Sequence, residues 1–333
     1  MPFSPAILAL TASSWIVVFL VLLAAGFALQ VVRHWDIASG SERQLQLERR
    51  TYLISTILTY TFAIEIVALL LYVYNAEQMS PQFVGAMCAT GVLNVNGYGW
   101  PTLFLKIVVF FLAAMWLMLN YIDNKGYDYP LVRTKYLLLL VIAPLVAAEA
   151  AVQTLYFVNL EPDVITSCCG SLFSASAKGV AAELAGLAPK PAMIAFYGMA
   201  AALALSGVWL LRRGSGGPLF AGLSLVVFMT ALAAIVSFVS LYVYEQPHHH
   251  CPFCVLKSGH DYIGYYFYVP LFAGAALGLG AGVLAPLRRV ASLQNVIGND
   301  VRRFAGLALV LLGLFYAVAT WAMLRSNLVL LGG

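Results

Sequence analysis

Long apolar stretches alternate with short polar ones along the whole chain. We count eight apolar runs, each near the roughly 20 residues that a helix needs to cross a bilayer, and none shows the period-two alternation of a barrel strand. The runs cover residues 7–32, 51–75, 101–121, 136–158, 191–211, 219–243, 262–286 and 304–324. The pattern predicts an all-α, polytopic membrane protein whose transmembrane helices form one bundle, a single domain over residues 1–333.

Composition supports a membrane environment. Hydrophobic residues make up 62% of the chain and charged residues 10%, against roughly 45 to 50% and about 25% in soluble domains. The net charge of +4 is spread over several loops beside helix ends, which indicates membrane anchoring and not nucleic-acid binding. No Lys or Arg precedes the first apolar run, so we expect a retained helix in place of a cleaved signal peptide.

The basic residues predict the orientation of the chain. Lys and Arg accumulate in short cytoplasmic loops, and most of the 18 basic residues fall in alternate loops. These are Arg33, Arg43, Arg49, Arg50, Lys125, Arg133, Lys135, Arg212, Arg213, Arg288, Arg289, Arg302 and Arg303. We therefore expect a protein of the cytoplasmic (inner) membrane, with both termini and all cysteine-bearing loops on the extracytoplasmic side.

Three outward-going runs end in similar sequences. Tyr72, Tyr156 and Tyr242 each follow a leucine, and Glu65 and Glu149 both lie seven residues before their tyrosine. Helical-hairpin repeats are one interpretation, and the general enrichment of Tyr at membrane interfaces is the other. The outer segments 76–100 and 159–190 are too long for structureless loops, so we expect them to pack over the outer face.

The most specific motif is Cys251-Pro-Phe-Cys254. This spacing at the start of a helix suits thiol–disulfide exchange, because a helix N-terminus stabilises a thiolate. The same spacing supplies two ligands for zinc or copper, and a static disulfide is a third interpretation. Histidines on either side are candidate metal ligands: His248, His249, His250 and His260. The residue after the second cysteine is not His, which excludes a haem-attachment motif.

The other three cysteines also lie in expected outer loops. Cys168 and Cys169 are adjacent, and a disulfide between neighbours is strained and easily reduced. They are equally candidates for separate pairing or for metal ligation. Cys88 stands in a glycine-rich stretch, where a simple buried thiol is the alternative to a role in chemistry. An odd number of cysteines leaves at least one free, metal-bound or intermolecular.

Three ionisable residues interrupt the apolar runs: Glu65, Lys106 and Glu149. A charge at mid-span costs about 2.5 to 3.5 kcal/mol on insertion scales, so it normally has a partner or a function. We predict that Lys106 pairs with at least one of the glutamates. The pair is either purely structural or part of a proton route, since thiol chemistry coupled to a quinone also moves protons.

Aromatic and small residues mark two further features. Tyr262, Tyr265 and Tyr266 are candidates to line a quinone pocket, although an interfacial aromatic belt explains them as well. Glycines at four-residue spacing within the seventh run predict a face for close helix packing. They are Gly274, Gly278 and Gly282. The outer loops contain no P-loop, H-E-x-x-H motif or nucleophile elbow, so ATPase and hydrolase functions are not indicated.

Three functions follow from these features. The first is an extracytoplasmic thiol–disulfide oxidoreductase or electron-transfer protein, with Cys251 and Cys254 as the primary pair and a quinone as cofactor. Its arrangement resembles the quinone-linked thiol oxidases of the disulfide-bond-formation and vitamin K epoxide reductase type, in that a C-x-x-C lies near a helix end; no residue roles follow from this. The second is a protein that handles zinc, copper or another thiophilic ion.

The third function is a non-catalytic anchor subunit of a larger membrane complex. In each case the partners we expect are membrane lipid and an extracytoplasmic thiol or redox protein, or the other subunits of such a complex. Whether the chain is an enzyme is left open by its sequence.

Overall fold

The computed structural model describes residues 4–161 and 187–330. Helices make up 81% of it, and the described residues contain no strand. Eight helices are long and apolar enough to cross a membrane, as the apolar runs predict. The chain is therefore an all-α, polytopic membrane protein in contact with lipid. Its internal contacts divide it into two compact units.

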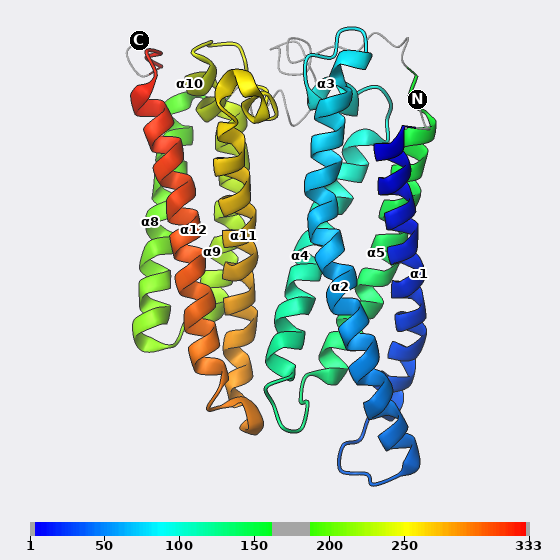
Figure 1. Ribbon diagram of the computed structural model, residues 1–333. Helices are drawn as coiled ribbons and strands as arrows, with labels where there is room; N and C mark the ends of the chain where they lie inside the picture. Colours follow the sequence, from blue (N-terminus) through cyan, green and yellow to red (C-terminus); the bar gives the residue numbers. More distant parts are fainter. Residues whose placement is uncertain (1–3, 162–186, 331–333) are drawn as a thin grey trace. The chain divides into compact units, whose positions relative to one another are not determined.

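The first unit is a bundle of four long helices (Figure 1). They are α1 (Pro5–His34), α2 (Glu42–Met79), α4 (Gly99–Asp123) and α5 (Val132–Val158). Each helix packs on the next in the chain, and α5 packs back on α1, so the four form a closed ring. The core contains large side chains with no exposure, among them Phe62, Trp116 and Tyr136. In this ring α2 and α5 occupy diagonal positions.

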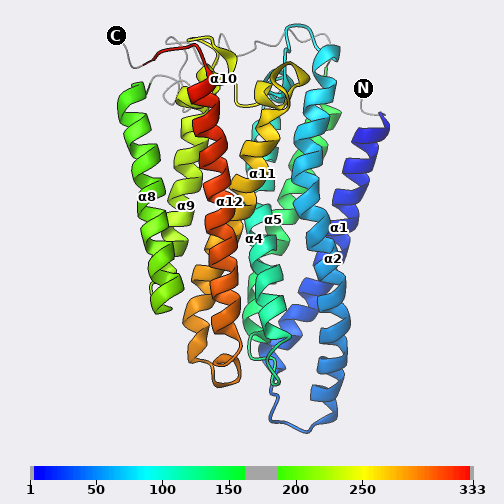
Figure 2. The ribbon, with the colours of Figure 1, turned by 60° about the vertical axis from the view of Figure 1, so that its left-hand side comes forward.

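The second unit is also built on a ring of four helical spans, seen from another side in Figure 2. They are α8 (Pro189–Arg213), the continuous stretch α9–η2–α10 (Gly217–Ala234, Ile235–Val239, Ser240–Tyr244), α11 (Ile263–Leu284) and α12 (Ile297–Arg325). Again each packs on the next, and α12 packs on α8. The segment Phe83–Gly91 belongs to this unit, and α3 (Ala89–Leu93) begins within it.

Short 3₁₀ turns complete the connections of the chain. They are η1 (Ser80–Gln82), η3 (Cys254–Leu256), η4 (Ser258–His260), η5 (Ala285–Arg289) and η6 (Ala291–Leu293). The first of these ends α2, which is one helix of 38 residues and so joins the polar segment after Ser41 to the apolar run 51–75. No Gly or Pro interrupts that stretch, and the Ser41 side chain caps its first turn by accepting a hydrogen bond from the amide of Gln44 at 3.3 Å.

The predicted glycine face of the seventh span is confirmed. A Cβ atom built on Gly278 would lie 2.2 Å from Ser224 Oγ, and one on Gly282 would lie 2.3 Å from Ala221 Cβ, both on α9. A Cβ on Gly274 would lie 2.8 Å from Leu312 of α12. Because α11 has no side chains at these positions, its backbone approaches both neighbouring helices closely.

Candidate functional site

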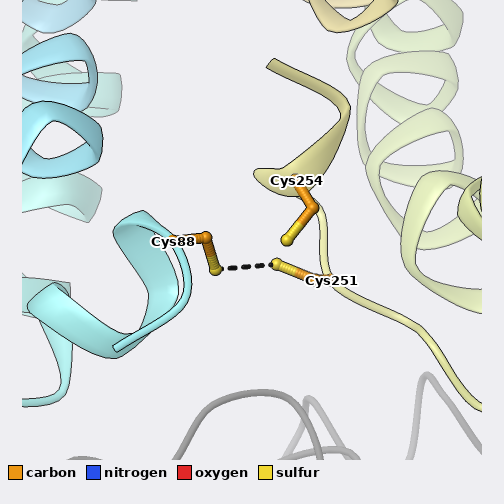
Figure 3. A group of neighbouring side chains, drawn as sticks. All are labelled: Cys88, Cys251 and Cys254. Carbon is orange, nitrogen blue, oxygen red and sulfur yellow. Dashed lines mark hydrogen bonds between the residues drawn. The ribbon is translucent and has the colours of Figure 1, made fainter. Parts of the chain in front are cut away.

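Two segments far apart in the sequence bring three cysteines together in the second unit. Cys88 immediately precedes α3, and Cys251 and Cys254 lie in the loop between α10 and α11 (Figure 3). The Sγ atoms of Cys88 and Cys251 are 3.2 Å apart, although 163 residues separate them in the chain. All three sulfur atoms lie within 4.8 Å of one another. We call this group the three-sulfur cluster.

The three-sulfur cluster is shielded from solvent. Cys88 and Cys251 have no exposed surface, and Cys254 is 6% exposed. The structure holds the three as thiols, with no disulfide among them. The hydroxyl of the equally buried Thr90 lies 3.2 Å from Cys251 Sγ. A hydroxyl at this distance can donate to a thiolate, so it would favour the form of cysteine that binds metals and attacks disulfides.

Tyrosines from the two flanking helices hold the Cys251–Cys254 loop. The hydroxyl of Tyr244, at the end of α10, donates to the carbonyl oxygen of Cys251 at 2.6 Å, and that of Tyr268, in α11, donates to the carbonyl of Pro252 at 2.6 Å. On the other segment, the carbonyl of Met87 accepts a hydrogen bond from the Lys257 ammonium group. These bonds position the backbone on both sides of the sulfurs.

The C-x-x-C motif does not lie at the start of a long helix. Cys254 starts a 3₁₀ turn of three residues, and α11 begins only at Ile263. A long helix therefore does not direct its N-terminal amide groups at the sulfurs. Any stabilisation of a thiolate must come from nearby donors such as Thr90, or from a cation bound to the sulfurs.

The histidines around the motif have other contacts. The described residues place no histidine nitrogen in the three-sulfur cluster. The rings of His249 and His260 pack on the ring of Tyr244, with centroids 4.3 and 4.6 Å away. His248 is exposed. The structure thus joins Cys251 and Cys254 to Cys88, not to the histidines that precede them.

His250 fastens the start of the loop to a π-helical turn. Its Nδ1 lies 2.9 Å from the carbonyl oxygen of Val236, which belongs to the π turn Ile235–Val239. A carbonyl can only accept, so Nδ1 carries the proton and Nε2 is the basic nitrogen of the neutral ring. A π turn changes the register of backbone hydrogen bonds, and this imidazole provides a donor there.

His260 is the loop residue whose titration is perturbed. Burial lowers the pKa of His260, and the neighbouring His249 and Lys257 lower it further, while Asp261 opposes them. The neutral imidazole therefore persists at a lower pH than is usual for histidine. His260 also lines a cavity of 620 Å³ between α12, the end of α10 and the start of α11, together with Trp321 and Tyr266.

The three candidate quinone-binding tyrosines differ in position. Tyr266 lines the cavity that His260 also lines. Tyr262 and Tyr265 pack on each other, with ring centroids 6.3 Å apart, and are not among the residues that line it. All three are exposed on the second unit, as residues of an interfacial aromatic belt would be.

The predicted pairing of Lys106 is confirmed in the first unit. Lys106 Nζ lies 2.5 Å from Glu149 Oε1, and both side chains are 1% exposed. Glu65 is close enough to Glu149 and Lys106 to interact with both electrostatically, and it is 4% exposed. The three ionisable residues of the apolar runs thus form one buried cluster, to which α2, α4 and α5 each contribute one residue.

A second buried ion pair was missed by the sequence analysis. Lys135 Nζ lies 2.8 Å from Asp123 Oδ2, and Asn120 accepts from the same ammonium group at 2.8 Å. Lys135 belongs to the first turn of α5 and is 1% exposed, so it is not an anchor in a loop. Asp123 ends α4 and Lys135 lies in the first turn of α5, and only a short turn joins the two helices. An acid and a base at such neighbouring helix ends are the sequence signal that could have revealed the pair.

Cys168 and Cys169 lie outside the described residues. The candidate site therefore rests on Cys88, Cys251 and Cys254. Comparison with known proteins found no family model, no curated protein and no solved structure that matches this chain. Its function has to be argued from the chemistry of its own residues.

Proposed function

We propose that the protein binds a thiophilic metal ion, such as copper or zinc, through Cys88, Cys251 and Cys254. The observation that supports the proposal is the convergence of three sulfur atoms within 4.8 Å of one another. Thiolates bound to one zinc ion at about 2.3 Å in tetrahedral geometry lie roughly 3.8 Å apart. Small movements of the side chains would bring all three sulfurs to that distance.

The burial of the sulfurs favours a metal over exchange with a protein partner. A cysteine of another protein must reach a sulfur to form a mixed disulfide, but Cys88 and Cys251 have no exposed surface. A metal ion needs far less space. Several thiolates in an apolar pocket are also costly without a cation, whereas a bound metal removes that cost. Soft thiolate ligands select copper(I) and zinc over calcium or magnesium.

Three protein ligands leave one position of a tetrahedral site open. Structural zinc sites are normally closed by four protein ligands, whereas an open position allows exchange with a ligand from outside. We propose that this position receives the donor that delivers or removes the ion. On the expected topology the site faces the extracytoplasmic side of the cytoplasmic membrane, where metal donors and acceptors are small molecules or proteins.

The test is metal analysis of the full-length protein, purified anaerobically. We expect stoichiometric copper or zinc in the wild type, and its loss in the variants C88S, C251S and C254S, one substitution at a time. M87L is the matched control, because it removes a sulfur beside Cys88 from a side chain that is 70% exposed. Metal-free wild type after growth with added copper or zinc, or metal retained in all three serine variants, would contradict the proposal.

The second candidate function is thiol–disulfide electron transfer. It is favoured by the 3.2 Å separation of Cys88 Sγ and Cys251 Sγ. Cys251 also has Cys254 as its C-x-x-C partner, so two thiols are available to form a disulfide with it. Two thiols would form a disulfide and release two electrons and two protons to a quinone or to a partner's disulfide. Metal-free protein whose thiols are oxidised by quinone and restored by dithiol reductant would establish this function. Sulfurs inert to both tests would leave the role of an anchor subunit.

A further inference from the structure

The charges of the buried cluster of Glu65, Lys106 and Glu149 do not balance. Glu65 and Glu149 carry two carboxyl groups, and Lys106 supplies a single ammonium group to offset them. All three residues are buried, with whole-residue exposures of 4%, 1% and 2%. A net negative charge in the apolar part of a membrane protein is strongly unfavourable. The cluster therefore needs one further positive charge to be neutral.

The hydrogen bonds of Glu149 indicate where that charge lies. Its Oε1 accepts from Lys106 Nζ at 2.5 Å, but its buried Oε2 has no donor. The carboxyl of Glu65 lies close to Glu149. Carboxylates only accept hydrogen bonds, so two ionised glutamates cannot bond to each other. A proton on one of them provides the missing donor and the missing charge together.

We propose that Glu65 and Glu149 share one exchangeable proton within the membrane, beside the ammonium group of Lys106. Two carboxyls in one buried site repel each other when both are ionised, which favours the state in which one proton remains on the pair. The site is thus a proton-binding site of the first unit. It is independent of the proposed metal function, because it involves none of the cysteines.

The titratable groups around the pair do not supply another proton. Tyr72 of α2 faces Lys106, with its ring centroid 5.6 Å from Nζ, and its hydroxyl donates to the carbonyl of Gly99. Tyr156 of α5 donates to the carbonyl of Val92. The described contacts of α1 in this region are polar but uncharged, as in the bond from Gln153 to Ser14. Among the described residues, Lys106 is the cation that contacts the pair.

The experiment combines infrared spectroscopy with carbodiimide labelling of the full-length protein in lipid nanodiscs. Dicyclohexylcarbodiimide enters membranes and reacts with protonated carboxyls. We expect labelling of Glu65 or Glu149 at neutral pH, and a carboxylic C=O band that shifts in D₂O because the proton exchanges. The exposed Glu42, at the start of the same helix, is the internal control and stays unlabelled.

Two substitutions change the proton content in opposite directions. E65Q keeps a donor for Glu149 but removes the proton, so both the band and the labelling are lost. K106M removes the ammonium group, so each carboxyl then takes a proton and the band grows about twofold. These opposite shifts exclude a general loss of structure as their cause. The proposal would be overturned by the absence of the band in the wild type or by an unchanged band in E65Q. Labelling blocked by sodium ions would also overturn it, by showing a metal cation in place of the proton.

Discussion

At the scale of single residues, Cys251 shows how contacts distant in sequence define the site. Its sulfur lies 3.2 Å from both Cys88 Sγ and Thr90 Oγ1, and its carbonyl oxygen is held by Tyr244. Only Tyr244 is near it in the chain. The C-x-x-C spacing identified Cys251 and Cys254, but no local pattern relates Cys88 to them. That relation arises from the packing of two loops against each other.

His260 provides a prediction of pH dependence at the same scale. Burial lowers its pKa, so we expect a value below the usual figure of about 6.5. The unfolded chain then takes up this proton at a higher pH than the folded chain. The stability associated with the neutral ring is therefore present above pH ~6.5, the pKa of the unfolded chain. It is lost as the pH falls from there to the pKa of the folded protein.

The measurement is the titration of His260 by NMR in protein with labelled histidine. His249 is the second cause of the shift, so H249F, which keeps an aromatic ring against Tyr244, should move the pKa of His260 upward. H248F is the matched control and should leave the titration unchanged, because His248 is exposed and not among the causes. A pKa of His260 at or above 6.5 in the wild type would show the prediction to be wrong.

At the scale of helices, the glycines of α11 determine how closely its neighbours pack. A Cβ on Gly282 would lie 2.4 Å from the backbone carbonyl oxygen of Gly217, which cannot move aside as a side chain can. We therefore expect G282A to destabilise the second unit by about 1 to 3 kcal/mol, the usual cost of overpacking. A lower midpoint of thermal unfolding in detergent would be the measured result.

Gly222 on α9 is the matched control for this prediction. A Cβ there meets nothing within 4 Å, and alanine is the better helix former by up to about 1 kcal/mol. G222A should thus leave the unfolding midpoint unchanged or raise it. Equal midpoints for G282A and the wild type would mean that α9 and α11 are less closely packed than described.

The helices were largely predictable from sequence, whereas the site was only partly so. All eight spans follow from apolar length, because lipid requires it. The pairing of Lys106 with Glu149 follows from the cost of a charge among apolar residues. By contrast, the sequence pattern places Lys135 in a loop, and its pairing with Asp123 depends on how the turn between α4 and α5 brings the two helix ends together. Such tertiary proximity has no periodic signature.

At the scale of the whole molecule, the chain consists of two units, each with a ring of four helical spans packed in chain order. Glu65 and Tyr72 of α2 and Glu149 and Tyr156 of α5 belong to the same unit, and the two tyrosine rings are 5.9 Å apart. The matched sequences of these helices thus serve one core. The origin of these two helices in a repeated helical hairpin stays a prediction.

The orientation in the membrane is the last prediction at this scale. Lys135 is buried in an ion pair, so it is removed from the count of basic loop residues that predicts the orientation. The remaining basic residues still fall mainly in alternate loops. Within the second unit, Arg212 and Arg213 end α8 at the turn into α9, whereas Asn327, just past α12, bonds to Glu245 beside the Cys251–Cys254 loop. The end of α12 and this loop therefore lie on one side.

Reporter fusions test this orientation in a bacterial host. Alkaline phosphatase is active only outside the cytoplasm, so a fusion after Gly333 should be active, and an insertion at Ser215, in the turn after α8, should not. Green fluorescent protein at the same positions should give the opposite result, because it matures in the cytoplasm. Activity of the phosphatase at Ser215 would place the three-sulfur cluster on the cytoplasmic side, where the metal donors and reductants are different.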